Sequence, residues 1–159
     1  MVDETVRRQL FESLDTLGRK LTAAEEASEK VSHDRRAAVE GARDKMQNVV
    51  LPALNRIATE AQGKGHVAGA QVTKRVDAKN PGSLPLDCEF EVRVVSGRAV
   101  RAKATCTFVV DDNNGRITRE WRDGSDTNRR DPWKPDEVTD DVVWAEIAAF
   151  LGHLGERKR

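Results

Sequence analysis

The strict alternation of apolar and polar residues in two neighbouring segments constrains this fold more than any other feature of the sequence. In residues 86–94 and 100–110, every second residue is apolar or cysteine. A period of two is typical of a β-strand with one buried face. Gly97 lies between the two segments and supplies a turn, so together they predict an antiparallel hairpin. Its core face carries the two cysteines of the chain, Cys88 and Cys106.

The pairing of Cys88 with Cys106 depends on the register of this hairpin. A three-residue loop at residues 96–98 places the two cysteines opposite each other, whereas a shift of two residues keeps the faces and separates the sulfurs. The sequence alone therefore predicts the face and not the register. Burial in apolar surroundings raises the pKa of a thiol and makes it unreactive. We expect two reduced, buried thiols.

A second hairpin follows, because Asn114-Gly115 favours a two-residue turn of type I′. This turn pairs Val110 with Arg119 and Phe108 with Trp121. It also places Ile117 and Trp121 on the core face. With an earlier strand over about residues 66–76, the chain predicts a four-stranded antiparallel meander, in which residues 128–140 form a polar, proline-containing connection after the last strand.

The N-terminal third of the chain is expected to be helical. Residues 2–62 contain a single proline, Pro52, which we expect to kink or end a helix. Apolar residues recur there in steps of three and four, which indicates an amphipathic helix. The first such stripe comprises Val6, Leu10, Leu14, Leu17 and Leu21. A second stripe runs from Val39 to Ala61, and residues 29–37 between the two stripes are polar.

Residues 1–62 can form one long helix or a helical hairpin. One unbroken helix would be about 90 Å long at 1.5 Å per residue, and a domain of this size could not cover it. Either the chain folds back near Ser32, which we favour, or the first helix pairs with another chain. A last amphipathic helix is indicated by Val143, Ile147, Phe150, Leu151 and Leu154.

These elements predict an α+β fold: a long N-terminal helix or helical hairpin, an antiparallel sheet with one face covered by helix, and a C-terminal amphipathic helix. Residues 1–62 form a helical segment that can act as a dimerisation or docking arm. Residues 63–159 form one globular unit together with residues 36–62.

Composition argues against several classes of protein. The chain has 159 residues, and its 27 basic residues balance its 27 acidic ones. This balance does not favour nucleic acid or an anionic membrane as the partner. No apolar stretch approaches the roughly 20 residues that span a bilayer. The charged N-terminus does not look like a signal peptide, so a cytoplasmic protein is expected.

The sequence offers no catalytic, cofactor-binding or metal-binding residues. His33, His66 and His153 lie one in each region and lack the close spacing of zinc ligands. Neither cysteine has a histidine nearby in sequence. Glu89 and Glu91 share a strand face with basic residues, which is typical of ion pairs across a solvated sheet. We expect no cofactor and lean towards a protein that is not an enzyme.

The leading hypothesis is a non-enzymatic protein–protein interaction domain, an adaptor or a self-associating protein, that acts through its N-terminal helical segment. The first stripe also resembles the seam of a short coiled coil, with a homodimer or another protein as partner. Trp133, flanked by prolines in the predicted connection, is a further candidate contact. Two alternatives remain. One is a small-ligand or enzymatic pocket between a curved sheet and helices. The other is nucleic-acid binding through the basic sheet region.

Overall fold

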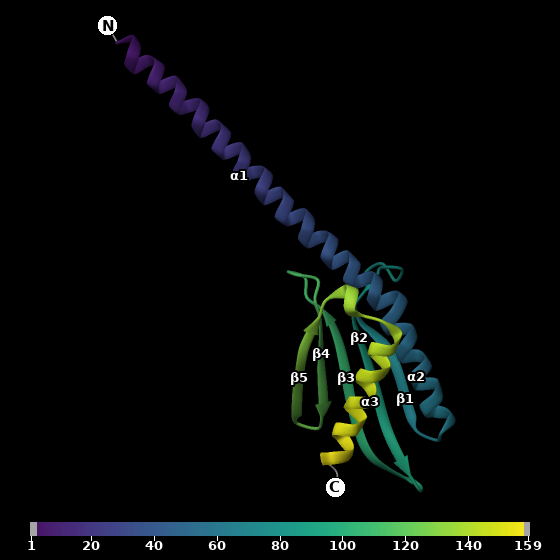
Figure 1. Cartoon of the computed structure of the whole chain (residues 1–159). Coiled ribbons are helices and arrows are strands. Elements are labelled where there is room, and N and C mark those ends of the chain that lie inside the picture. Colours follow the sequence, from purple (N-terminus) through teal and green to yellow (C-terminus); the bar gives the residue numbers. More distant parts are fainter. Residues whose placement is uncertain (1–2, 158–159) are drawn as a thin grey trace. The chain divides into compact units, whose positions relative to one another are not determined.

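A computed structural model describes residues 3–157 of the chain, so residues 1–2 and 158–159 of the predicted segments lie outside the described part. The chain divides into two compact units, residues 1–37 and residues 38–159. The elements, labelled in Figure 1, are α1 (Glu4–Lys45), the π-helical turn η1 (Met46–Val50), α2 (Leu51–Gly63), β1 (Val67–Arg75), β2 (Pro85–Ser96), β3 (Ala99–Val110), β4 (Ile117–Asp123), β5 (Asp126–Trp133), the 3₁₀ turn η2 (Pro135–Glu137) and α3 (Asp140–Arg157). The α+β class, the long N-terminal helix, the antiparallel sheet and the C-terminal helix are as predicted.

The N-terminal region is one long helix, and the favoured fold-back near Ser32 is wrong. α1 runs for 42 residues without a break through the polar segment of residues 29–37. That segment contains no glycine or proline, and its glutamate, lysine and arginine residues are good helix formers. Local propensity therefore continues the helix where tertiary packing is absent. Every residue from 3 to 37 is exposed.

Pro52 changes the helical hydrogen bonding without ending the helix. A proline has no backbone N–H to donate to the preceding turn. Directly before it, the five residues of η1 widen into a π-helical turn, in which the Leu51 N–H donates to the carbonyl of Met46. α2 then begins with Pro52 in its first turn, where the missing N–H costs little.

The sheet has five strands rather than the predicted four, in the spatial order β1-β2-β3-β4-β5. All neighbouring strands are antiparallel. The additional strand, β5, occupies part of the segment that was expected to be a connection. It lies at the edge of the sheet and most of its residues are exposed, so it lacks the alternation of a half-buried strand. Pro132 lies near its end, a position that an edge strand tolerates.

The first hairpin has the predicted faces in a register that separates the cysteines. Cys88 pairs with Phe108, and Phe90 pairs with Cys106. A bulge after Val94 shifts the pairing before the turn at Gly97. Both cysteines are buried and free, as predicted.

The second hairpin also has the predicted faces, but its register differs by two residues. Val110 pairs with Ile117 and Phe108 with Arg119, so the predicted pairs are wrong. The loop closes through a hydrogen bond from the Asp111 N–H to the carbonyl of Arg116, and Gly115 N–H donates back to Asp111. This longer loop is stabilised because the side chains of Asp111 and Asn114 accept hydrogen bonds from backbone N–H groups two residues further on.

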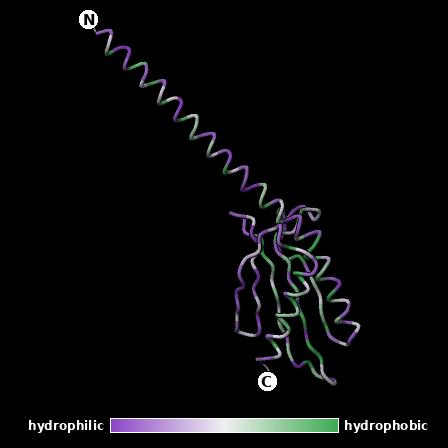
Figure 2. Tube along the Cα trace, viewed as in Figure 1, coloured by the Kyte–Doolittle hydropathy of each residue, from purple (hydrophilic) through white to green (hydrophobic). Residues whose placement is uncertain are grey.

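One face of the sheet forms the core of the unit of residues 38–159. The helices α2 and α3 cover this face (Figure 1), and hydrophobic residues concentrate on the strands and helices that meet there (Figure 2). The fully buried residues with the largest side chains include Phe90, Phe108, Phe150, Met46 and Leu54. The other face of the sheet carries the alternate, polar set of side chains, as the alternation in the sequence predicts.

Candidate functional site

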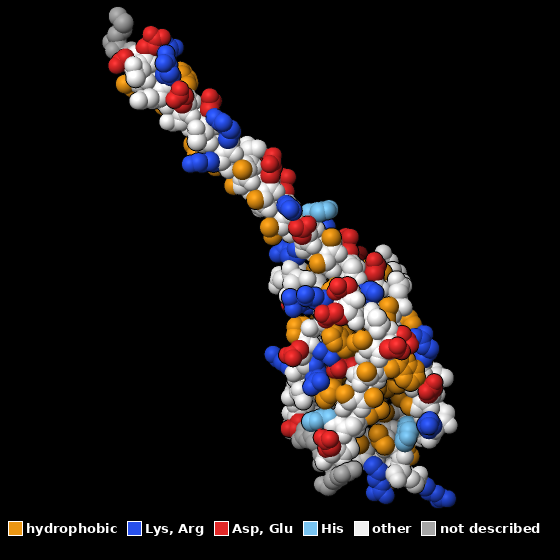
Figure 3. Space-filling view, viewed as in Figure 1, with side chains coloured by type: hydrophobic (Ala, Val, Ile, Leu, Met, Phe, Trp, Pro, Cys, Tyr) orange, Lys and Arg blue, Asp and Glu red, His pale blue; other side chains and the backbone are white. Residues whose placement is uncertain are grey.

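The apolar residues predicted as a coiled-coil seam lie on α1 and are all exposed. Their exposed fractions are 54% for Val6, 57% for Leu10, 52% for Leu14, 53% for Leu17 and 58% for Leu21. Two further large apolar side chains on the same helix, Phe11 and Val31, are also exposed. These seven residues are called the α1 stripe below. The hydrophobic side chains of the helix are visible between charged ones in Figure 3.

Exposure of this kind is unusual in the surface of a protein that works alone. Scattered apolar residues are normal on a surface, but a contiguous row of large ones marks an interaction site. Within residues 3–37, the hydrogen bonds of the helix side chains are local, such as Thr16 to the Glu12 carbonyl and Thr22 to the Gly18 carbonyl. Tertiary packing therefore does not explain the leucines of this segment.

Trp133 occupies a different setting from the one that the sequence suggested. It is the last residue of β5 and is half-buried, not part of a loop. Its ring lies 6.0 Å from that of Phe108, and the Arg119 guanidinium carbon lies 3.9 Å from its centroid. The side chain thus packs on the core of its own unit.

A buried ionic cluster, which the sequence reasoning missed, lies between β4 and α3. Glu146 of α3 is 6% exposed and Arg119 of β4 is 7% exposed. Arg119 Nη1 donates to Glu146 Oε2 at 2.6 Å, and Trp121 Nε1 donates to Glu146 Oε1 at 3.0 Å. Arg130 Nε lies 3.7 Å from Glu146 Oε1, and its guanidinium group stacks on Trp121. Arg119, Trp121, Arg130 and Glu146 are called the Glu146 cluster below.

The chemistry of the Glu146 cluster is that of a structural ion pair. Burial lowers the pKa of Arg119, and the charge of Glu146 counteracts this effect. Arg119 also donates to the backbone carbonyl of Asp131. Both carboxylate oxygens of Glu146 already accept hydrogen bonds inside the protein. A general acid or base needs a free oxygen within reach of a substrate, which this buried carboxylate does not offer.

The two thiols are equally unsuited to nucleophilic chemistry. Burial, followed by the charge of Asp87, raises the pKa of Cys88 to about 12. Burial also raises the pKa of Cys106, with a smaller contribution from Glu146. Because the thiolate is the reactive form, neither cysteine acts as a nucleophile near neutral pH.

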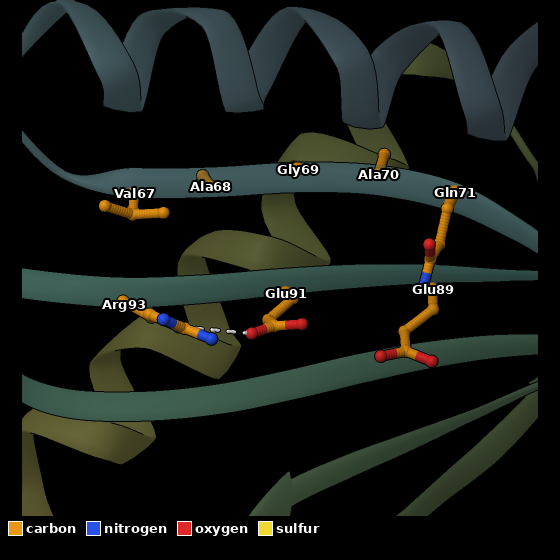
Figure 4. A pocket seen from close by; sticks show the side chains of 8 residues that line it. All are labelled: Val67, Ala68, Gly69, Ala70, Gln71, Glu89, Glu91 and Arg93. Atoms are coloured by element: carbon orange, nitrogen blue, oxygen red, sulfur yellow. Dashed lines mark hydrogen bonds and ion pairs between the residues drawn. The ribbon is translucent and has the colours of Figure 1, made fainter.

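The open face of the sheet holds a shallow hollow of about 370 Å³ over β1 and β2 (Figure 4). Gly69, which has no side chain, lines it, and so do Glu91 and Arg93, which form an ion pair at 3.3 Å. Lys103 lies 3.7 Å from the same glutamate. Further along the same face, Glu120 of β4 pairs with two arginines of β4 and β5 in the same way. Acidic residues therefore neutralise much of the basic charge on this face.

A second hollow, of about 340 Å³, lies between the β4–β5 hairpin and the end of α3. Its apolar part is formed by Trp121, Phe150 and Leu154, with His153 beside them. The ionisable residues that line it are exposed or half-buried. This hollow is large enough for a ligand. None of the ionisable residues that line it is buried, however, and catalytic sites typically use such buried groups.

Within residues 3–157, no three His, Cys, Asp or Glu side chains are grouped so that they could hold a metal ion. No helix in the described part of the chain is both long and apolar enough to cross a bilayer. Comparisons with known protein families, with curated proteins and with solved structures find no match to this chain.

Proposed function

We propose that this protein is a non-enzymatic interaction domain that self-associates through the α1 stripe as a short coiled coil. The observation that carries the proposal is the exposure of seven large apolar residues on one helix, five of them at spacings of three and four residues. Such spacing brings the side chains to one face, where a second helix can cover them.

The energetics favour a contact that uses the whole stripe. Full burial of a leucine side chain contributes about 2 kcal/mol. A side chain that is half exposed in the single chain can therefore still gain about half of this amount when a partner covers it. Association itself costs about 4–15 kcal/mol in lost freedom of motion. One or two leucines on each chain therefore do not suffice, whereas the complete stripe on two chains can offset this cost.

A cytoplasmic location belongs to the same proposal. The two cysteines of the chain are free, and proteins of reducing compartments usually keep their thiols unpaired. The two alternative functions gain less support. The hollow beside α3 lacks a buried ionisable group, and the basic side chains of the sheet face are largely paired with glutamates.

Sedimentation equilibrium on the full chain tests the proposal. We expect the wild-type protein to have twice its chain mass of 17.7 kDa at micromolar concentrations. The double variant Leu14→Glu/Leu17→Glu should be a monomer, because it places charges in the seam. Thr16→Glu/Ala23→Glu adds the same two charges on the side of α1 away from the stripe and should remain a dimer. A wild-type monomer at 100 µM, a concentration about a hundredfold above an expected micromolar dissociation constant, overturns the proposal.

A further inference from the structure

The α1 stripe fits a heptad repeat with a defined phase. Leu14 and Leu21 occupy position a, and Leu10, Leu17 and Val31 occupy position d. α1 is continuous over this whole range, so one phase applies throughout. The two remaining members of the stripe, Val6 and Phe11, then fall at the flanking positions g and e. Positions e and g usually carry charged residues, so two large apolar side chains there indicate a further contact with the partner helix.

We infer that the partner of the α1 stripe is a second copy of this chain, aligned parallel and in register. This inference rests on the proposed function and specifies its geometry. In a parallel pair, a residue at g faces the residue at e five positions later on the other chain. Val6 then meets Phe11 of the second copy, and Lys20 meets Glu25 of the second copy. Each contact occurs twice by symmetry.

The remaining flanking positions agree with this alignment. Ser13 faces Gly18 of the second copy, and Ala27 faces Ser32. The parallel arrangement therefore contains one apolar contact and one ion pair on each side, and no two like charges oppose each other at the flanking positions e and g. In the seam itself, Arg7 at position a faces Arg7 of the second copy once, near the start of the coil. The parallel arrangement also pairs every leucine of the seam with its own counterpart.

The antiparallel alignment that matches most leucines is less favourable. It places Leu14 against Leu17 and Leu10 against Leu21. In an antiparallel pair, however, residues at position e face position e of the other chain, and residues at position g face position g. Glu4 consequently opposes Glu25 of the second copy, twice in the dimer. Opposed like charges are unfavourable, and charges at e and g determine the orientation of a coiled coil.

Moving the antiparallel alignment by one heptad toward the C-terminus does not remove the conflict. Lys20 then opposes Lys20 of the second copy, and Phe11 faces Glu25. Only Leu17 and Leu21 still pair with each other, while Leu14 meets Ala24. Moved by one heptad in the other direction, the antiparallel alignment has no like charges at its flanks, but only Leu10 and Leu14 still pair with each other, and Leu17 meets Arg7. Each antiparallel register thus has either a like-charge contact at its flanks or a seam with fewer leucine pairs than the parallel one.

The parallel arrangement has a consequence for the rest of the chain. Both copies leave the coil at the same end, after Val31, and only residues 32–37 separate this point from the second unit. Two copies of residues 38–159 are therefore held at one end of the coil. Any surface of that unit is presented twice, which raises the avidity for a partner with two matching sites.

Reversal of the charge at Glu25 tests the orientation, because the parallel arrangement predicts weaker dimerisation and the antiparallel pairing with Glu4 predicts tighter dimerisation. In the parallel dimer, Glu25→Lys places two lysines together at both flanks and should raise the dissociation constant about tenfold. Lys20→Glu/Glu25→Lys restores the pair and should return the constant to within about twofold of wild type. Glu26→Lys makes the same charge change at an outward position and should have little effect. Tighter association of the Glu25→Lys variant overturns the inference in favour of the antiparallel pairing with Glu4.

Disulfide exchange provides an independent readout in the full chain. We expect mixtures of Arg7→Cys with Ala24→Cys, and of Arg7→Cys with Val31→Cys, to form only homodisulfides in a glutathione buffer. Two of the antiparallel registers instead place position 7 against 24 or 31, so a heterodisulfide overturns the parallel alignment while the proposed self-association stands. A monomeric wild-type protein refutes both the proposed function and the inference, and a mass three times that of the chain refutes the pairing of two copies.

Discussion

The buried carboxylate of Glu146 is predicted to be a major source of stability in the unit of residues 38–159. In the variant Glu146→Gln, the shape of the side chain is kept and its charge is lost. Arg119, which is 7% exposed, then has no opposite charge within the core, and Trp121 and Arg130 lose the anion that they share. Removal of one partner from a buried ion pair typically costs about 3–5 kcal/mol.

We take about 3 kcal/mol as the expected loss for Glu146→Gln, at the lower end of that range, because the amide oxygen can still accept one of the two hydrogen bonds. Urea unfolding followed by tryptophan fluorescence measures this loss. With a slope of about 2 kcal/mol/M, the midpoint should fall by about 1.5 M. Trp121 donates directly to Glu146, so its emission should report the same change in the folded state.

Glu120 provides a matched control for this experiment. It also pairs with two arginines, but on the open face of the sheet, where Arg122 and Arg129 are exposed. Glu120→Gln should cost less than about 1 kcal/mol, as exposed ion pairs do. A double variant, Arg119→Met/Glu146→Leu, should recover a large part of the loss, since apolar replacement of a whole buried pair is often neutral. A Glu146→Gln loss no larger than that of Glu120→Gln would refute the reasoning.

Three further predictions concern the loops and the thiols. Gly115→Ala should destabilise the protein by more than Gly124→Ala, measured by urea unfolding. Both glycines have a positive φ, in which a side chain costs about 1–2 kcal/mol. Of the two, Gly115 alone has a steric clash as well, because a Cβ there would lie 2.8 Å from the Val39 amide nitrogen and closer still to the Ala38 carbonyl. Cys88 and Cys106 should resist a thiol reagent at pH 8 until the protein is unfolded. The free energy of unfolding should fall above pH 9, because the unfolded Cys88 thiol loses its proton there while the folded one keeps it to about pH 12. This loss reaches about 2 kcal/mol at pH 10.5.

Each of these predictions has a clear opposing result. Equal losses in the two glycine variants would mean that the loop does not pack on the backbone of α1 as described. Rapid labelling of both thiols in the folded state would place them on the open face of the sheet. The pH effect should be smaller in a Cys88→Ala variant, and an unchanged slope would assign it to other groups such as lysines.

Sequence alternation identified the faces of the strands correctly because a period of two is imposed by burial of one face. It could not fix the registers, since any shift by two residues leaves the same side chains in the core. The side-chain hydrogen bonds of Asp111 and Asn114 decided the second loop instead. β5 escaped detection because an exposed edge strand has no buried face to impose alternation.

The helical region shows the opposite limit of sequence reasoning. The expectation of a fold-back near Ser32 assumed that a small domain must cover all of its apolar helix. α1 continues instead, because nothing in residues 29–37 stops a helix. The five predicted residues of the α1 stripe were found from their spacing. Phe11 was missed because it lies beside that spacing and gains a role only when a second helix is considered.

The Glu146 cluster could have been anticipated only in part. Arg119 stands between Ile117 and Trp121 in the alternation of β4, which places it on the core face. Glu146 lies three residues after Val143 on α3, so it too falls near an apolar face. Neither position alone predicts their pairing, which joins residues far apart in sequence through the packing of α3 on the sheet.

The simple order of the strands also bears on how the chain folds. Each strand pairs with the strand that precedes or follows it in sequence, so most sheet contacts close short loops. Chains rich in such local contacts fold faster than those that join distant strands. We therefore expect the hairpins to form one after another, with the docking of α3 as the last step, because α3 carries Glu146 onto a sheet that already holds Arg119 and Trp121. A chain truncated before α3 would leave that arginine in an apolar surface without its counter-charge.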